Sequence, residues 1–245
     1  MTRLLVLQPD ADDPPARLGE WLTAAGAVLD VVKPYEEPVP ATLDGYQGVV
    51  CLGGAMGALD DAVHPWLADV RKLLSHAVSK RVPLLAICLG AQLLAAATGG
   101  QVRRSPAGPE VGVQLVAKRD AASGDPLFAD LPWTPDVLQF HEDEVGLLPP
   151  TALLLASSPK CANQAFRVGD RAYGVQFHIE TTPDVVLGWA AGYPEVVGGV
   201  RPGVLDPDRL TAGHEDIREV WQPFAERFVR LAAGELTIHR SLPLV

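Results

Sequence analysis

Apolar segments alternate with helix-patterned segments over residues 1–100, and this order constrains the fold more than any other feature of the chain. The expected strands are Arg3–Gln8, Val28–Val32, Gly48–Leu52 and Val82–Ile87. The spacing of apolar residues predicts helices at Ala16–Gly26, Pro65–Lys80 and Gly90–Thr98. Strands that are apolar on both sides are typical of a parallel sheet covered by helices on both faces. The first half of the chain therefore predicts an α/β fold.

The pattern changes in the second half, where short apolar segments follow one another closely. The expected strands are Val111–Ala117, Val137–Phe140, Ala152–Ala156, Gln164–Val168 and Arg171–Phe177. Close strands favour antiparallel pairing, and Gly169-Asp170 suits a hairpin turn. Helices are expected at Pro183–Ala190 and Glu215–Ala233, with a long loop rich in Gly and Pro from Gly192 to Gly213. The whole pattern predicts a mixed, mainly parallel sheet.

Length and composition agree with one domain. The chain has 245 residues, of which 48% are hydrophobic, and we expect residues 1–235 to form a single domain, with 236–245 as a C-terminal tail. The net charge of −10 argues against nucleic-acid and anionic-membrane partners. The start of the chain lacks the apolar core of a signal peptide, and no segment has the roughly 18 apolar residues of a membrane span. A cytoplasmic protein is expected.

The three cysteines, Cys51, Cys88 and Cys161, are odd in number and widely spaced, with no CxxC pair. This spacing argues against a disulfide framework and against a structural zinc site. No metal ion and no cofactor are predicted. Cys51 lies in an apolar strand and is expected in the core, whereas Cys161 lies in a polar loop and is expected to be exposed or open to oxidation.

Cys88 carries the strongest chemical signal, because a buried strand runs into it and a helix follows directly, with small residues at Ala86 and Gly90. This is the pattern of a nucleophile elbow, whose sharp turn needs small neighbours. A helix N-terminus favours a thiolate and offers free N–H groups to an oxyanion. A small core residue at the end of a strand is the alternative.

Two further segments could complete such a site. His178 ends an expected strand and Glu180 lies two residues on, so both side chains share one face and Glu180 could orient the imidazole. A surface ion pair is the alternative. The segment LGGAMG places Gly53 and Gly54 after a strand but lacks the GxGxxG dinucleotide fingerprint. It suits an oxyanion hole or an ordinary turn.

These segments together resemble the class I, triad-type glutamine amidotransferases. ICLGAQ around Cys88 resembles the family's GxCxGxQ elbow, and QFHIE resembles its FHPE element. FHED at 140–143 resembles an SHxD-type segment, and the hairpin before His178 also matches in order. The resemblance runs from the first strand to the helix after Glu180. It implies a flavodoxin-like or Rossmann-like amidotransferase fold.

The resemblance also implies roles for individual residues. Cys88 matches the nucleophile, His178 the general base and acid, and Glu180 its orienting partner. The backbone at Gly54 and Leu89, with Gly53 beside it, matches the oxyanion hole. Gln92 matches a glutamine contact, and His141 and Asp143 match the segment near the substrate's amino-acid end. The chain departs from the family pattern at Ala55, Ala86, Ala91 and Ile179, none of which removes a catalytic group.

The function implied is hydrolysis of the glutamine side-chain amide through a cysteine thioester, with ammonia released for a separate acceptor enzyme. The residues outside the matched region are fewer than the roughly 100–200 of another domain, so a synthetase would be a separate subunit. A γ-glutamyl peptide hydrolase acting alone is the alternative, and a non-catalytic regulatory module is a second. The segment Gly192–Gly213 is a candidate lid, docking loop or oligomer contact. The oligomeric state is left open.

Overall fold

A computed structural model describes residues 1–236 of the chain. The helices are α1 Ala16–Ala24, α2 Trp66–Lys80, α3 Leu89–Ala97, α4 Pro183–Gly192, α5 Pro194–Val197 and α6 Pro207–Ala232, with a 3₁₀ helix, η1, at Asp120–Gly124. The strands are β1 Thr2–Leu7, β2 Ala27–Val32, β3 Gly48–Cys51, β4 Leu84–Ile87, β5 Gln101–Arg104, β6 Glu110–Leu115, β7 Ala117–Lys118, β8 Asp136–His141, β9 Asp143–Leu147, β10 Ala152–Ser157, β11 Ala165–Val168 and β12 Ala172–Val175.

The main sheet has eight strands in the order β2-β1-β3-β4-β12-β11-β10-β7. The strands from β2 through β12 in this order are parallel, and the remaining pairs are antiparallel. Two antiparallel ribbons, β5–β9 and β6–β8, complete the strand structure. The expected α/β fold with a mixed, mainly parallel sheet is confirmed, as is the hairpin turn between β11 and β12.

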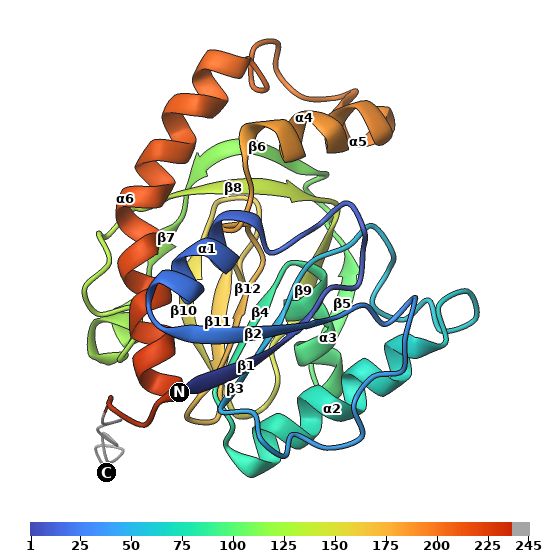
Figure 1. Cartoon of the computed structure of the whole chain (residues 1–245). Coiled ribbons are helices and arrows are strands. Elements are labelled where there is room, and N and C mark those ends of the chain that lie inside the picture. The colour runs from blue at the N-terminus through green and yellow to red at the C-terminus, as the bar shows by residue number, and fades with distance from the viewer. Residues whose placement is uncertain (237–245) are drawn as a thin grey trace.

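Side-chain alternation along the central strands builds a separate core on each face of the sheet. Leu4 and Val6 of β1 pack in one core with residues of α1 and α6, including Leu18 and Trp221. Leu5 and Leu7 point the other way and share the second core with residues of α2 and α3. Figure 1 shows α1 and α6 on one side of the sheet and α2 and α3 on the other. This two-sided burial explains why these strands lack polar alternation.

The parallel strands bring separate parts of the chain to one edge of the sheet. β1, β3, β4 and β12 are consecutive in the sheet, and their carboxyl ends point the same way. The residues that follow these ends include Asp13, Gly53, Cys88 and His178. Open α/β sheets bind ligands at this edge, so the topology alone selects the site.

The prediction of a long loop at Gly192–Gly213 was wrong. This segment contains α5 and the first turns of α6. Asp206 caps α6, because its side chain accepts hydrogen bonds from the N–H groups of Asp208 (3.1 Å) and Arg209 (3.2 Å). Asp followed by Pro is a helix-start signal, and the Gly and Pro content of the segment obscured it.

Two further expectations differ from the structure. The β5–β9 ribbon was not expected, because its strands QVRR and DEVGL carry charged side chains and little apolar alternation. Cys161 is fully buried instead of exposed, and burial raises the pKa of its thiol to about 12. Cys51 is buried in the core as expected. The expected C-terminal tail lies outside the described residues, apart from its first position.

None of the helices within residues 1–236 combines the length with the apolar character that a membrane span requires.

Gly90 in α3 should be essential for the strand-to-helix turn. A Cβ at this position would overlap the backbone oxygen of Cys51 and lie 2.9 Å from its carbonyl carbon. Gly90→Ala should therefore destabilise the protein by about 1–3 kcal/mol, as overpacking does. Gly188→Ala, in the exposed part of α4 with open space around it, should instead stabilise by about 0.5–1 kcal/mol. Urea unfolding measures the change in the free energy of unfolding for both variants. An equal change in the two variants would contradict the packing argument.

Candidate active site

Cys88 lies at the turn between β4 and α3, with backbone angles φ 48° and ψ −109°. A residue with a side chain rarely adopts this conformation, and such strain is typical of functional turns. The Cys88 N–H donates to the carbonyl of Val175 (2.8 Å), and the Cys88 carbonyl accepts from the N–H of Gln92 (3.0 Å). These bonds to β12 and α3 hold the thiol at the N-terminus of a helix. The expected strand–Cys–helix turn is present.

His178 and Glu180 follow β12 and form a buried pair. His178 is paired with Leu138 of β8 through two backbone hydrogen bonds, of 2.8 and 3.2 Å. Its Nδ1 is hydrogen-bonded to Glu180 Oε1, and the other carboxylate oxygen accepts the Ile179 N–H (2.8 Å). A proline at position 179, as in the family pattern, could not donate that bond. The pair is buried, so the surface alternative does not apply.

The free nitrogen of His178 belongs to the same site as Cys88. His178 Nε2 has no hydrogen-bond partner within residues 1–236. A Cβ placed at Gly53 would lie 3.1 Å from His178 Cε1 and 3.4 Å from Cys88 Cβ, which shows that the two side chains are neighbours. Burial alone would lower the pKa of His178, but the charge of Glu180 and the neighbouring Cys88 side chain hold it well above the usual range. The charge of His178 in turn outweighs burial and lowers the pKa of Glu180.

The two glycines after β3 have different surroundings. The backbone N–H groups of Gly54 and Leu89 donate no hydrogen bond to any part of the chain that the structure describes. Gly54 lies against Leu89, since a Cβ on it would be 3.1 Å from Leu89 Cδ2. Two free donors near the thiol are what an oxyanion hole requires. At Gly53, a Cβ would overlap the carboxyl of Asp13, so this glycine makes room for that side chain.

The predicted substrate contacts all line or adjoin one pocket, but they are bonded to one another. Gln92 donates to the carbonyl of Asp143 and to the side chain of Gln176, each at 3.3 Å. His141 has Nδ1 on the carbonyl of Asp143 (2.9 Å) and Nε2 facing Glu110 (3.2 Å). His141 and Gln92 thus hold the turn at Asp143 in place. Direct contact of either with substrate stays a prediction.

Sequence reasoning missed three side chains of the site. The Gln176 amide donates to Cys88 Sγ (3.7 Å), and its only signal was its place two residues before His178. Trp189 of α4 packs on His178 with ring centroids 4.8 Å apart, and its indole N–H donates to the Asp12 carbonyl (2.7 Å). Asp13 comes from the loop after β1, where no motif marked it.

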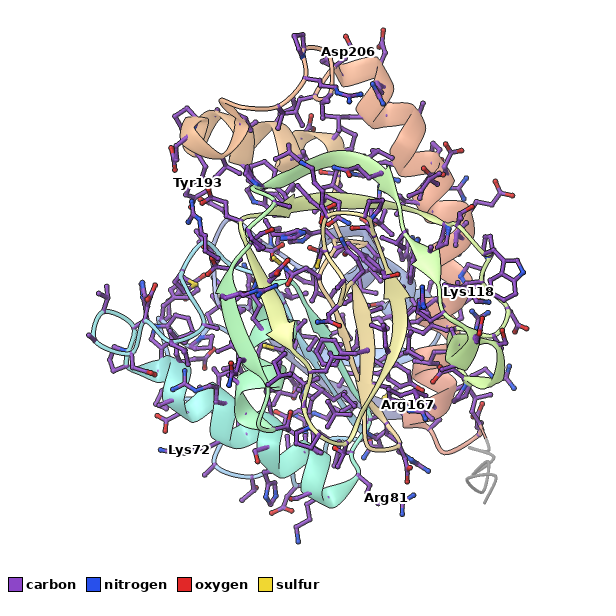
Figure 2. All side chains as sticks on the ribbon, turned by 180° about the vertical axis from the view of Figure 1, so that it is seen from behind. Lys72, Arg81, Lys118, Arg167, Tyr193 and Asp206 are labelled. Carbon is purple, nitrogen blue, oxygen red and sulfur yellow. The ribbon has the colours of Figure 1, made fainter. Side chains whose placement is uncertain are left out.

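The pocket over Cys88 has a volume of about 430 Å³. Its walls come from the β1 and β3 loops, the 140–143 turn and the α4–α5 segment. Figure 2 labels Tyr193, one of the lining residues, at the α4–α5 corner. Among the lining residues that the structure describes, Arg104 is the one Arg or Lys, and it is paired with Glu142. The acidic lining residues are Asp10, Asp12, Asp13, Asp60, Glu142, Asp143 and Glu195. Negative charge therefore dominates the pocket.

Asp13, His178 and Glu180 place one ligand-type atom each within 4.8 Å of one another. Two of these side chains, however, are already hydrogen-bonded to each other, and the remaining nitrogen of His178 is on the side of Cys88. The arrangement fits an oriented acid–base histidine better than a metal centre.

Comparison with known proteins places the chain in a family. The Glutamine amidotransferase class-I profile matches residues 20–185. A glutamine-hydrolysing GMP synthase of Christiangramia forsetii is 31% identical over 151 residues, which are 61% of this chain but only 27% of that synthase. Gamma-glutamyl peptidase 4 of Arabidopsis thaliana is 26% identical over 199 residues, 80% of this chain and 78% of the peptidase.

A solved structure agrees with these matches. The crystal structure of a glutamine amidotransferase from Thermotoga maritima superposes with a TM-score of 0.81 and 28% identity, covering 94% of this chain and 97% of the other. The fold, the order of the motifs and the family profile thus lead to one assignment: the chain belongs to the class-I glutamine amidotransferase family.

Proposed function

We propose that the protein hydrolyses γ-glutamyl amides, with glutamine as the simplest substrate and Cys88 as nucleophile. The observation that carries this proposal is the strained Cys88 turn, beside the buried His178–Glu180 pair and the free N–H groups of Gly54 and Leu89. A thiol at a helix N-terminus next to an imidazolium is the arrangement that yields a reactive thiolate.

The reaction has two halves. The Cys88 sulfur attacks the γ-carbonyl carbon, and the oxyanion formed is held by the two backbone N–H groups. The proton on His178 Nε2 moves to the leaving nitrogen, the C–N bond breaks, and a thioester remains on Cys88. His178 then takes a proton from water as the water attacks the thioester, and the C–S bond breaks to release glutamate. Glu180 keeps the imidazole oriented in both halves.

The leaving group distinguishes the two enzymatic candidates. With glutamine it is ammonia, which would pass to a separate acceptor enzyme; the similarity to a glutamine-hydrolysing GMP synthase supports this candidate. The pocket, however, extends to Tyr193, Glu195 and Val196 on the α4–α5 segment and leaves room for a larger leaving group. That observation, with the similarity to a γ-glutamyl peptidase along most of both chains, favours a γ-glutamyl peptide hydrolase as second candidate.

Hydrolysis of glutamine and of γ-glutamyl dipeptides by the purified protein alone tests both candidates. Cys88→Ala should lower turnover about 10⁴-fold or more, because no thioester can form. Ammonia release and glutamate formation are the measurements. Cys161→Ala is the matched control, since that thiol is buried away from the pocket, and it should keep activity. Equal turnover by wild type and Cys88→Ala would exclude the mechanism. Failure of a glutamine-analogue electrophile to label Cys88 would favour a non-catalytic module instead.

The pH dependence of kcat/KM should reflect the raised pKa of His178. The imidazolium must protonate the leaving nitrogen, so activity should persist above pH 7 and fall as the pH rises through that raised pKa. Glu180→Gln removes the negative charge that raises the pKa of His178, so the alkaline limb should move to lower pH. Turnover should also fall about 10²- to 10⁴-fold. An alkaline limb unchanged in Glu180→Gln would contradict the assigned role.

The charge of the pocket should select the leaving group. A γ-glutamyl dipeptide with a neutral C-terminal amide should be cleaved faster than one with an acidic second residue, because acidic side chains surround the pocket. The preference should shrink in 1 M salt, where the screening length is about 3 Å. Glu195→Gln should reduce the ratio of the two cleavage rates about twofold to fivefold. Glu20→Gln on exposed α1 surface is the control and should leave it unchanged. A preference insensitive to both salt and Glu195 would exclude this explanation.

A further inference from the structure

Asp13 is a buried acid that the mechanism above does not use. Its side chain is only 2% exposed, although it lies in a loop between β1 and α1. The loop is held from both ends. Gln8 donates to the carbonyl of Asp10 (3.0 Å), and Trp189 donates to the carbonyl of Asp12 (2.7 Å). Arg17 at the start of α1 donates its N–H to the carbonyl of Glu180 (2.9 Å). The position of Asp13 is thus set by the same residues that surround the site.

The polar surroundings of Asp13 are unusual for a carboxylate. Neither of its oxygens has a hydrogen-bond donor with regular geometry within residues 1–236. Its polar neighbours are the backbone N–H of Gly53 and a second acceptor, the carboxylate of Glu180, one oxygen of which lies within 4.8 Å of an Asp13 oxygen. Two buried carboxyl groups at this distance cannot both be ionised without a large cost, and Glu180 is the one paired with His178. Burial and the charge of Glu180 outweigh the opposing effects of the His178 charge and the Gly53 N–H, and they hold the pKa of Asp13 well above its usual range.

We propose that Asp13 is a positioning residue that carries a proton and donates a hydrogen bond to Glu180, so that the site is a four-membered chain of Cys88, His178, Glu180 and Asp13. This inference deepens the proposed function and rests on it for its catalytic consequence. Gly53 supports it, because only a residue without a Cβ leaves room for the Asp13 carboxyl beside His178.

The hydrogen bond should moderate the basicity of His178. Glu180 already accepts bonds from His178 and from the Ile179 N–H. A further donor spreads its negative charge, so that the carboxylate attracts the imidazolium proton less strongly. His178 must give up its proton in the first half of the reaction and take one from water in the second. A proton held too tightly would slow the first step, and it would leave too little unprotonated imidazole to act as the base in the second.

The charged and titratable groups around this chain come from every element that packs on it. They are Cys51 at the end of β3, Cys88 before α3, His178 and Glu180 after β12, and His214 of α6, whose Nε2 meets the Thr181 hydroxyl at 3.1 Å. Arg17 of α1 adds a positive charge behind His214, where its guanidinium donates to the His214 carbonyl (2.9 Å) and pairs with Glu215. His214 is itself buried, and burial lowers its pKa, so it adds no fixed positive charge near Glu180.

The proton on Asp13 can be observed directly. In the infrared difference between wild type and Asp13→Asn at pH 7, the carbonyl band of a protonated carboxylic acid should be present in the wild type and missing from the variant. A difference that shows only ionised carboxylate would overturn the proposal. This measurement does not depend on any substrate or on the folding of a truncated variant, because Asn has the size of Asp.

The pH profile of γ-glutamyl amide hydrolysis tests the role of the bond. Asp13→Asn should keep the wild-type alkaline limb, since its amide can donate to Glu180 in the same place. Asp13→Ala lacks a donor and should move the limb to higher pH by at least about half a unit, with lower turnover at pH 7. Two results would overturn this role. One is an alkaline limb that moves to lower pH in Asp13→Asn, as the loss of a negative charge would cause. The other is an alkaline limb that does not move in Asp13→Ala.

Loss of hydrolytic activity and loss of the infrared band would have different meanings. A wild-type protein without hydrolytic activity on any γ-glutamyl amide would overturn the proposed function, while the infrared band would still report the state of Asp13. If the wild type is active but lacks the band, the proposed function is retained and the proposed hydrogen bond from Asp13 to Glu180 is rejected.

Discussion

The backbone pairing of β4 with β12 is the interaction on which the site depends. Val175 lies opposite Ile87 in the parallel register, and the Cys88 N–H bonds to the Val175 carbonyl at 2.8 Å. A slip of one residue would turn every side chain of β12 to the opposite face. The register therefore decides that His178, 90 positions later in the chain, follows the strand next to Cys88. Packing of both sheet faces keeps that register, so core and site are stabilised by the same contacts.

Much of this arrangement could be predicted from local patterns. The strand–Cys88–helix turn was visible because a sharp turn needs small neighbours, and His178 with Glu180 was visible because residues i and i+2 share one face of an extended segment. Asp13 and Trp189 gave no such signal, since their roles come from contacts across loops and helices far apart in sequence. The burial of Cys161 escaped prediction for the same reason: its polar neighbours describe the loop, not what packs on it.

The departure at Ile179 has a physical reading in the structure. Its N–H donates to Glu180, so the residue that replaces the family's proline adds a bond that proline lacks. The segment loses the rigidity of a proline ring, but the hydrogen bond from the Ile179 N–H to the Glu180 carboxylate offsets this loss. The fold at this end of the chain thus holds Glu180 through the backbone of its own segment and through His178, instead of through a rigid ring.

Gly53 has a consequence for how sequences of this kind can vary. A Cβ at that position would overlap the Asp13 carboxyl and lie 3.1 Å from His178 Cε1 and 3.4 Å from Cys88 Cβ, so the Asp13 side meets it most closely. A larger residue at 53 is therefore compatible only with a smaller one at 13. Positions 13 and 53 lie on loops after different strands, and we expect them to co-vary among relatives. In a sequence alignment, this co-variation would indicate a contact that the sequence of either loop alone does not.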